Sequence, residues 1–576
     1  MKILGIHDGH NASVCLMLDG KIEYLVQEER IVKEKNKSGF PYKSLELIMS
    51  KFNLKPEDID KIGFNGDYMP KPFDRLERIN VYKKFLTDNQ LISTSKIKNV
   101  LKTIGPIAKP FEEKNRKHRL GLLKELGFDI DKVEFINHHL LHAATSYFGN
   151  GNYEDKVLIL TNDGAGDRIC SSVNIGYKGN IEKIAETHEY HSIAGVYAIF
   201  TFLTGMVPLE HEFKIMGMAP YADPKGCRKV ADEFWDMFEF SDDGLSWKFT
   251  KGGSVFRSMQ MFKDFMFLKR FDHLMGGLQL FIEEFLVKWV KNTIQKTGIK
   301  KLALGGGTFM NVKANKLLME IEEVEEIFIF PSCGDEANAA GICYFLENKF
   351  EGLQNINQLE DVYFGVEYTD KEIEQSFEKY NFTKYKYKIT KQDNIEKKLA
   401  ELLAEGYVLA RFKGREEFGA RSLGNRAIIA DPSKPEVIKE INEMIKNRDF
   451  WMPFASSILD EDIDKYIAWN GTKEKNNPYY MIMTYDTNPI AHTEISGGIH
   501  PYDKTVRPQL VTKEHNIDYW NLIKEFKNIT GIGGILNTSL NLHGLPLVYD
   551  PEDAFHVMEN SSLKYLALEN YLIEKI

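Results

Sequence analysis

Residues 137–147 read NHHLLHAATSY and place three of the chain's fifteen histidines within five positions. On a helix, side chains four residues apart project from the same face, so His138 and His142 could bind one metal ion together. Two histidines at this spacing also occur at ordinary helix starts, where they pack or cap the helix. The pair alone leaves both interpretations open.

Two aspartates could complete a metal site. Asp163 in TNDGAGD and Asp335 in PSCGDEANAAG each follow an apolar stretch typical of a strand, and α/β proteins gather ligands at strand carboxyl ends. Two imidazoles with one or two carboxylates and no thiolate suit iron, zinc or manganese, and ligand type does not choose among them. Either aspartate could instead begin a turn, and Asp335 could cap the helix expected over EANAAGICYF.

A glycine run follows a predicted strand at residues 304–311, LGGGTFMN. Without Cβ atoms, backbone amides can approach a phosphate or an adenosine closely, which predicts nucleotide contacts here. The run is not a P-loop, because no Gly-Lys-Ser/Thr follows it. The alternative is a tight turn with no ligand.

Cationic side chains concentrate in the second half of the chain. Guanidinium groups bind phosphate through two parallel hydrogen bonds. Because these arginines alternate with Phe, Gly, Ala and Leu in a chain of net charge −10, we expect a cationic pocket for a small polyanion rather than a solvated basic face. The positions are Arg411, Lys413, Arg415, Arg421, Arg426, Arg448 and Arg507, with Asn537 and Ser539 adding polar groups at a strand end.

The apolar pattern that must position these residues predicts an α/β fold with a repeated unit. KILGIHDGHNASVCLMLDGKIEYLVQEER reads as three strands joined by turns, and VLILTNDGAGDRICSSVNIGYKGNIEKI repeats that order. Two such meanders predict a duplicated nucleotide-binding fold of the actin and sugar-kinase type, with a cleft between its halves. We expect residues 53–131 to form an insertion of helices and loops, and residues 350–360 to form a linker.

The composition excludes several classes of protein. The 576 residues, 43 % hydrophobic and 27 % charged, are typical of a globular protein of several domains. The acidic balance speaks against nucleic acid as a partner. Five scattered cysteines without a C-x-x-C motif predict no thiolate zinc site and no disulfide framework. Since no apolar run approaches ~20 residues and the start lacks a signal core, we expect no membrane insertion and a cytoplasmic location.

Ten motifs, taken in order, resemble one known family. They are GIHDGHNAS, NHHLLHA, NDGAGD, EHEFKIMGMAPY, LGGGTFMN, PSCGDEANAAG, GREEFGARSLGNRAI, MPFASS, RPQ and LNTSLN. The series is similar to the NodU/CmcH-type O-carbamoyltransferases of nodulation-factor and antibiotic biosynthesis. This resemblance implies an actin-like domain over residues 1–352, like that of the tRNA threonylcarbamoyl-adenosine transfer proteins, and a YrdC-like α/β domain over residues 353–576.

The resemblance also implies an ATP-dependent reaction in two steps. Carbamoyl phosphate and ATP, with Mg²⁺, would form carbamoyl-adenylate in the C-terminal domain. The carbamoyl group would then pass to a hydroxyl of a sugar or natural-product acceptor, or a glycan precursor, beside a divalent metal in the N-terminal domain. That metal is iron in the best-described relatives.

Site residues carry over position by position. The resemblance implies metal ligands at His138, His142, Asp163 and Asp335, and assigns the cationic positions above, with Asn537 and Ser539, to carbamoyl phosphate and ATP. It implies carbamoyl-adenylate contacts in the N-terminal domain at Asp8, Gly9, Gly305, Gly306, Gly307 and Asn311. A base must take the proton of the acceptor hydroxyl, and His10 and His139 are the candidates, with Lys214 as a third catalytic candidate. Each of these three could equally be structural.

Two departures from the family pattern concern nucleotide and carbamoyl phosphate binding. Met452 stands where many relatives have an arginine, and His543 and Leu545 stand where an arginine and a glutamate are common. The main alternative function is an actin-like small-molecule kinase or ATPase; a tRNA-modification scaffold and an inactive paralogue are the others. The sequence leaves open the acceptor, the metal, and whether the chain is a homodimer.

Overall fold

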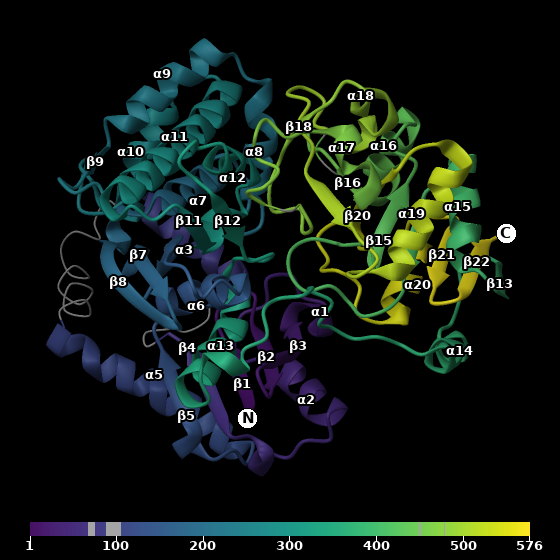
Figure 1. Cartoon of the computed structure of the whole chain (residues 1–576), viewed down its shortest axis with the longest axis horizontal. Coiled ribbons are helices and arrows are strands. Elements are labelled where there is room, and N and C mark those ends of the chain that lie inside the picture. Colours follow the sequence, from purple (N-terminus) through teal and green to yellow (C-terminus); the bar gives the residue numbers. More distant parts are fainter. Residues whose placement is uncertain (67–74, 88–104, 447–448, 450, 477) are drawn as a thin grey trace. The chain divides into compact units, whose positions relative to one another are not determined.

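Figure 1 shows a computed structural model of the chain. It describes residues 1–66, 75–87, 105–446, 449, 451–476 and 478–576, with the backbone alone at residues 87, 105–112, 444 and 446. The described residues form two compact units. The first unit contains Met1–Glu28, Asn36–Met310 and Ile321–Leu359; the second contains Glu29–Lys35, Asn311–Glu320 and Glu360–Ile576.

The first unit contains two five-stranded sheets of the same topology (Figure 1). In each sheet a three-stranded antiparallel meander is extended from its first strand by two parallel strands. One sheet has the order β3-β2-β1-β4-β5, with β1 (Lys2–His7), β2 (Ser13–Leu18), β3 (Lys21–Gln27), β4 (Lys61–Asn65) and β5 (Val133–Ile136). The other has the order β8-β7-β6-β11-β12, with β6 (Val157–Gly166), β7 (Ile169–Tyr177), β8 (Asn180–His188), β11 (Lys301–Gly305) and β12 (Glu326–Ile329). The structure therefore confirms a mixed α/β fold and the repeat predicted from the two sequence meanders.

The expected insertion at residues 53–131 is wrong in one respect, because this stretch contains strand β4. Its five residues, KIGFN, lie between Asp60 and Gly66 and are too few to show a strand pattern. They become a strand by pairing in parallel with β1 on one side and β5 on the other. Helices α3 (Arg75–Thr87) and α5 (Gly105–Glu125) do fall in the stretch, and its residues 67–74 and 88–104 lie outside the described part of the chain.

Two helices join the sheets of the first unit. Helix α13 (Asn338–Phe350) packs on β1 and β4, helix α6 (His138–Asn150) packs on β6 and β11, and the two helices pack against each other. Glycines permit this close packing: a Cβ at Gly5 would lie 2.0 Å from the Ala339 carbonyl oxygen, and one at Gly341 would lie 2.4 Å from Thr145 Oγ1. The other helices of the unit are α2 (Tyr42–Lys51), α7 (Ile193–Leu203), α8 (Glu212–Met218), α9 (Pro224–Trp235), α10 (Met259–Met266) and α11 (Phe271–Thr297).

The second unit is built on one eight-stranded sheet of order β13-β22-β21-β14-β15-β20-β16-β19. Its strands are β13 (Tyr387–Lys391), β14 (Leu409–Phe412), β15 (Arg426–Ala430), β16 (Ala455–Leu459), β19 (Pro508–Val511), β20 (Gly534–Ser539), β21 (Tyr565–Leu568) and β22 (Tyr571–Lys575). Successive residues of a strand face opposite sides, so Ile428 enters one apolar cluster while Ile429 enters another. The sheet is therefore covered on both faces.

Helices supply the rest of both clusters in the second unit. The cluster containing Ile428 also contains residues of α14 (Asp370–Lys379), α16 (Pro435–Ile441) and α20 (Pro551–Glu559). The cluster containing Ile429 also contains residues of α15 (Ile395–Glu405) and α19 (Ile517–Thr530). The two segments contributed from the N-terminal half carry most of α1 (Glu28–Val32) and all of α12 (Val312–Met319), and the short helices α17 (Ile463–Tyr466) and α18 (Ala491–Glu494) complete the unit.

Within the described part of the chain, no helix combines the length and the apolar character that crossing a membrane requires.

Candidate metal centre

The histidine pair lies at the start of helix α6. Asn137 caps this helix, since its side chain accepts a hydrogen bond from the Leu140 amide at 3.1 Å, and Gly151 ends it in a left-handed conformation with φ of 75°. His138 and His142 are therefore one turn apart, both buried, with their Nε2 atoms 3.0 Å from each other. The capping role suggested as an alternative for the histidines belongs to Asn137.

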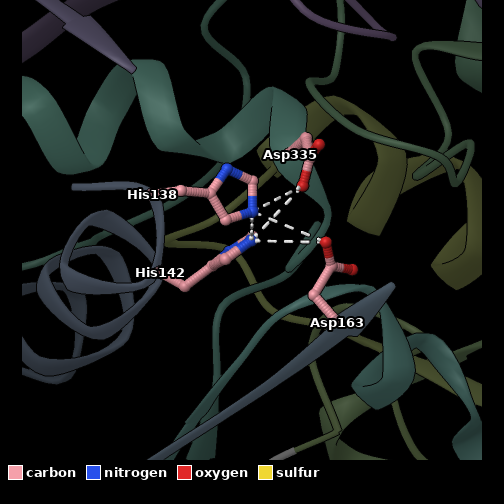
Figure 2. A group of neighbouring side chains, drawn as sticks. All are labelled: His138, His142, Asp163 and Asp335. Atoms are coloured by element: carbon pink, nitrogen blue, oxygen red, sulfur yellow. Dashed lines mark hydrogen bonds and ion pairs between the residues drawn. The ribbon is translucent and has the colours of Figure 1, made fainter. Parts of the chain in front are cut away.

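Asp163 and Asp335 face the histidine pair from two other segments, as Figure 2 shows. Asp335 Oδ1 lies 3.4 Å from His138 Nε2 and 3.3 Å from His142 Nε2; Asp163 Oδ2 lies 3.5 and 4.0 Å from the same atoms. One ligand atom from each of the four buried residues lies within 4.8 Å of every other. Helix α6, strand β6 and the residues before helix α13 thus bring together the four side chains named from the sequence.

The donor set fits a divalent ion. Asp335 Oδ1 is buried, forms no regular hydrogen bond with the described residues, and lies 3.3–3.4 Å from the two histidine Nε2 atoms. A buried carboxylate is costly unless a proton or a cation compensates its charge. The alternative role of Asp335 as a helix cap is wrong, because neither the short turn at Asp335–Ala337 nor helix α13 has a side-chain cap. Two imidazoles and two carboxylates suit iron, zinc or manganese.

The glycine run holds the Asp163 side of the cluster. The Gly307 amide donates to Asp163 Oδ1 at 2.9 Å, so one carboxylate oxygen is fixed while Oδ2 faces the histidines. A Cβ at Gly305 would lie 2.5 Å from the His142 carbonyl oxygen, and one at Gly306 would lie 2.3 Å from that of Asn162. The absence of side chains here is thus explained by close packing around the cluster.

Charges within the cluster determine its protonation. Burial lowers the pKa of His138, but Asp335 and Asp163 outweigh this and raise it to about 9. Burial raises the pKa of Asp335, yet the neighbouring histidines, His138 first, hold it well below its ordinary range. Because metal ligands must be deprotonated, an ion bound here would displace a proton from His138.

Of the two predicted bases, His10 forms an ion pair with the cluster, whereas His139 meets its two histidines through ring contacts. His10 Nε2 lies 3.3 Å from Asp335 Oδ2, and its side chain is 36 % exposed, so solvent or an acceptor can reach it. His139 differs, because its Nδ1 lies 2.8 Å from Thr161 Oγ1 and its Nε2 lies 3.1 Å from the Ile169 carbonyl oxygen. Both ring nitrogens of His139 are thus engaged in the buried core, which favours the structural alternative given for it in the sequence.

The remaining candidates of the N-terminal half have other partners. Asp8 is buried in a two-pronged ion pair with Arg119, whose Nε and Nη2 lie 2.7 and 2.9 Å from its oxygens. Gly9 lies beside it in the His10 loop, and Lys214 is half-buried on α8. Asn311 caps α12 by accepting from the Ala314 amide, and it belongs to the second unit. Asp8 and Asn311 thus have partners within the protein, and the adenylate contacts expected for them stay predictions.

Two of the arginines predicted to bind a polyanion are fully buried. Arg426 donates from Nη1 and Nη2 to backbone carbonyls, including those of Gly414 and Val366, and its guanidinium lies 3.6 Å from the centre of the Phe412 ring. Arg411 Nη1 donates to the Gly424 carbonyl and to Asn425 Oδ1, whereas its Nε and Nη2 have no partner among the described residues. Arg426 thus keeps only its Nε without a partner and mainly supports the structure, whereas Arg411 keeps two such donors, Nε and Nη2.

The other predicted polar residues divide in the same way. Arg415 donates to the Phe364 carbonyl, Lys413 pairs with Glu396 at 2.6 Å, and Ser539 donates to Asn541 Oδ1. Asn537 donates to the Ser422 carbonyl, while its Oδ1 is buried without a partner. Arg421 and Arg507 are half-buried, and Arg448 lies outside the described residues.

Several residues that organise these regions were not singled out in the sequence. Glu416 and Glu417 lie between the candidate arginines, and both are buried. Arg30, at the end of the first meander, contacts Glu416. The runs EER and GREEF both mix acidic and basic residues, and this was the only sign in the sequence of a buried ion pair. Nothing in the sequence showed that the two runs contact each other.

Comparison with known proteins agrees with this geometry. Residues 2–344 match the model described as carbamoyltransferase N-terminus, and residues 400–575 match that of carbamoyltransferase C-terminus. The chain belongs to the carbamoyltransferase family. It is therefore a carbamoyltransferase enzyme, which confirms the resemblance found from the motifs.

Individual relatives cover the full length of this carbamoyltransferase. An uncharacterised protein of Methanocaldococcus jannaschii is 30 % identical over the whole of both chains. Nodulation protein NolNO of Sinorhizobium fredii is 27 % identical over 98 % of this chain and 79 % of its own. Among solved structures, component A of the Acidaminococcus fermentans (R)-2-hydroxyglutaryl-CoA dehydratase is 11 % identical, covers 60 % of this chain and 97 % of its own, and has a TM-score of 0.33. A TM-score in this range does not establish a shared fold.

Proposed function

We propose that this carbamoyltransferase forms carbamoyl-adenylate from carbamoyl phosphate, water and ATP, with release of phosphate and pyrophosphate. It then transfers the carbamoyl group to a hydroxyl of a sugar or natural-product acceptor, with release of AMP. The proposal rests on one observation: in this member of the carbamoyltransferase family, four possible metal ligands lie close together. They are His138, His142, Asp163 and Asp335. A kinase of the actin-like type needs acidic ligands for Mg²⁺ but has no use for the buried histidine pair.

The proposed transfer step uses a divalent metal, which we take to be iron, held by the four converging side chains. Such an ion, when bound, would act as a Lewis acid toward the carbamoyl carbonyl or the acceptor oxygen. Gly307 keeps Asp163 oriented through its amide, and the burial of His138, His142 and Asp335 limits the access of water to the site. His10, partly exposed and beside Asp335, is the residue we propose to accept the proton of the acceptor hydroxyl.

We assign adenylate formation to the second unit. Carbamoyl phosphate and ATP are both anions, so their approach requires fixed cations, here with Mg²⁺ bound to ATP. Arg411 and Asn537 support this assignment, because both bind the turn at residues 422–425 and both keep buried polar atoms without protein partners. Arg421 and Arg507 complete the proposed set.

The resemblance extends to domain type and location. We propose an actin-like domain over residues 1–352, supported by the shared topology of the two five-stranded sheets, and a YrdC-like domain over residues 353–576. The reaction consumes ATP and carbamoyl phosphate, which supports a cytoplasmic location.

One incubation tests the proposal: purified protein, ATP, Mg²⁺ and carbamoyl phosphate, with Fe²⁺ and a panel of hydroxyl acceptors. We expect pyrophosphate release that depends on carbamoyl phosphate, followed by AMP release and an acceptor heavier by one carbamoyl group in the mass spectrum. Formation of ADP without carbamoyl phosphate would instead identify a kinase or ATPase.

Two variants separate the proposed steps. Arg421→Ala should stop pyrophosphate release, whereas His138→Ala should preserve it and stop carbamoyl transfer. Loss of both steps in His138→Ala, with the protein still folded, would contradict the assignment of the steps to separate sites.

A further inference from the structure

Arg30 is a buried cation that the proposed reaction does not yet use. It lies in the segment Glu29–Lys35, which belongs to the second unit, and its side chain is 5 % exposed. Its Nη1 donates to Glu416 Oε1 at 2.8 Å and to the Glu417 carbonyl, and its Nη2 donates to the Gly419 carbonyl at 2.6 Å. One guanidinium group therefore forms hydrogen bonds with three residues of a single loop.

We call this loop, residues 414–425, the arginine loop, because it contains Arg415 and Arg421. One edge is fixed by backbone pairing, because the Glu416 amide donates to the Val366 carbonyl and the Phe418 amide to that of Val362. At Gly419 the chain turns with a φ of +100°, a conformation that favours glycine. Arg30 binds the backbone on both sides of this change of direction, between the two arginines.

The buried charges make this contact necessary. Burial raises the pKa of Glu416, and the positive charge of Arg30 opposes the rise. Removing one partner from a buried ion pair leaves the other charge uncompensated, which is far more damaging than removing an exposed pair. The structure of the arginine loop therefore depends on a residue nearly 400 positions away in the sequence.

We propose that Arg30 is a positioning residue for adenylate formation: it holds the backbone of the arginine loop so that Arg421 is presented to the phosphorylated substrates. This inference rests on the proposed role of that loop in adenylate formation. Arg30 acts through the loop and not on the substrates, because its side chain is buried and both of its Nη atoms are bound to Glu416, Glu417 and Gly419.

Arg30→Met removes the charge and all three donors, and Arg30→Lys keeps the charge but cannot reach three acceptors at once. Since misplacing substrate-binding groups by about 1 Å can cost about 100-fold in rate, we expect Arg30→Met to lower kcat/KM for pyrophosphate release by about 100-fold. For Arg30→Lys we expect about tenfold, the effect of losing one charged hydrogen bond. Transfer from supplied carbamoyl-adenylate to an acceptor should stay at the wild-type rate in both.

Lys33→Met is the matched control. Lys33 lies in the same segment and pairs with Asp550 and Asp553, but it is 49 % exposed and does not contact the arginine loop. It should release pyrophosphate at the wild-type rate. Equal losses in Lys33→Met and Arg30→Met would assign the effect to general loosening of the segment and overturn the proposal.

Limited digestion with trypsin tests the same contact without activity. The arginine loop contains cleavage sites after Arg415 and Arg421, and both should be cut faster in Arg30→Met and Arg30→Lys than in wild type or Lys33→Met, with circular dichroism showing that each variant is folded. Cleavage at the wild-type rate in a folded Arg30→Lys variant would contradict the proposal. If wild-type protein releases no pyrophosphate, the proposed function fails, while the digestion still decides whether Arg30 holds the loop.

Discussion

In the first unit, two histidines and two aspartates from three segments turn toward one point; in the second, Arg411, Arg415 and Arg426 donate to backbone carbonyls of their own unit. In the metal cluster, Asp335 Oδ1 faces two histidines without forming a regular hydrogen bond, whereas both Nη atoms of Arg426 donate to main-chain carbonyls. The difference teaches that a dense run of one residue type is weaker evidence for a ligand than the convergence of different types from separate elements.

The physical basis of the difference is what each group can bind locally. An arginine has five donors, and the carbonyls of a glycine-containing loop provide acceptors nearby. The carboxylates and imidazoles of the cluster have mainly one another as neighbours. They remain together at a site like this only if a proton or a cation neutralises the carboxylates.

Removing a metal ligand is the strongest test of the difference between the two units. His142→Ala should lower Fe²⁺ affinity by more than about 100-fold, because loss of groups that merely orient ligands already costs 10–100-fold. Equilibrium dialysis with iron analysis measures it, and His188→Ala, an exposed histidine outside the cluster, should bind as wild type. Equal Fe²⁺ affinity in the two variants would contradict the assignment of His142 as a metal ligand.

Arg426→Ala tests the structural side of the comparison. We expect a loss of about 3–5 kcal/mol in the free energy of unfolding, because Glu416 and Glu417 lose a buried counter-charge. Denaturant unfolding measures it. The exposed Lys439, replaced by alanine, serves as the control and should change the value by less than about 0.5 kcal/mol. A loss that small in Arg426→Ala would restore Arg426 as a candidate ligand.

Gly306→Ala tests whether close packing explains the glycine run. Its φ of +102° and the 2.3 Å approach of its Cβ to the Asn162 carbonyl oxygen predict a cost of about 2 kcal/mol in the free energy of unfolding. Because Asn162 adjoins Asp163, iron affinity should also fall. Gly121→Ala, which places its Cβ in open space on helix α5, should be neutral or slightly stabilising by both measurements.

His139→Gln should have the smallest effect. The substitution keeps polar atoms near Thr161 and the Ile169 carbonyl, so we expect a loss of about 1 kcal/mol in the free energy of unfolding. Carbamoyl transfer should continue. A transfer rate reduced to that of a folded His10→Asn variant would make His139 the base after all.

Much of the site was predictable because it lies in short local patterns. The spacing of His138 and His142 fixes their common face on a helix, and strand ends locate Asp163 and Asp335. The alternating pattern of the two meanders predicted the repeated topology, but it could not reveal strand β4, whose five residues become a strand only between β1 and β5.

By itself, the sequence determined which residue types stand at helix starts, strand ends and turns, since 3.6- and 2-residue periods are local properties of the chain. The tertiary structure alone decided which of them meet: that Asp335 faces His138, that His139 turns into the core, and that Arg30 reaches Glu416. Contacts between residues hundreds of positions apart depend on how sheets and helices pack, and that packing leaves no periodic trace in either segment.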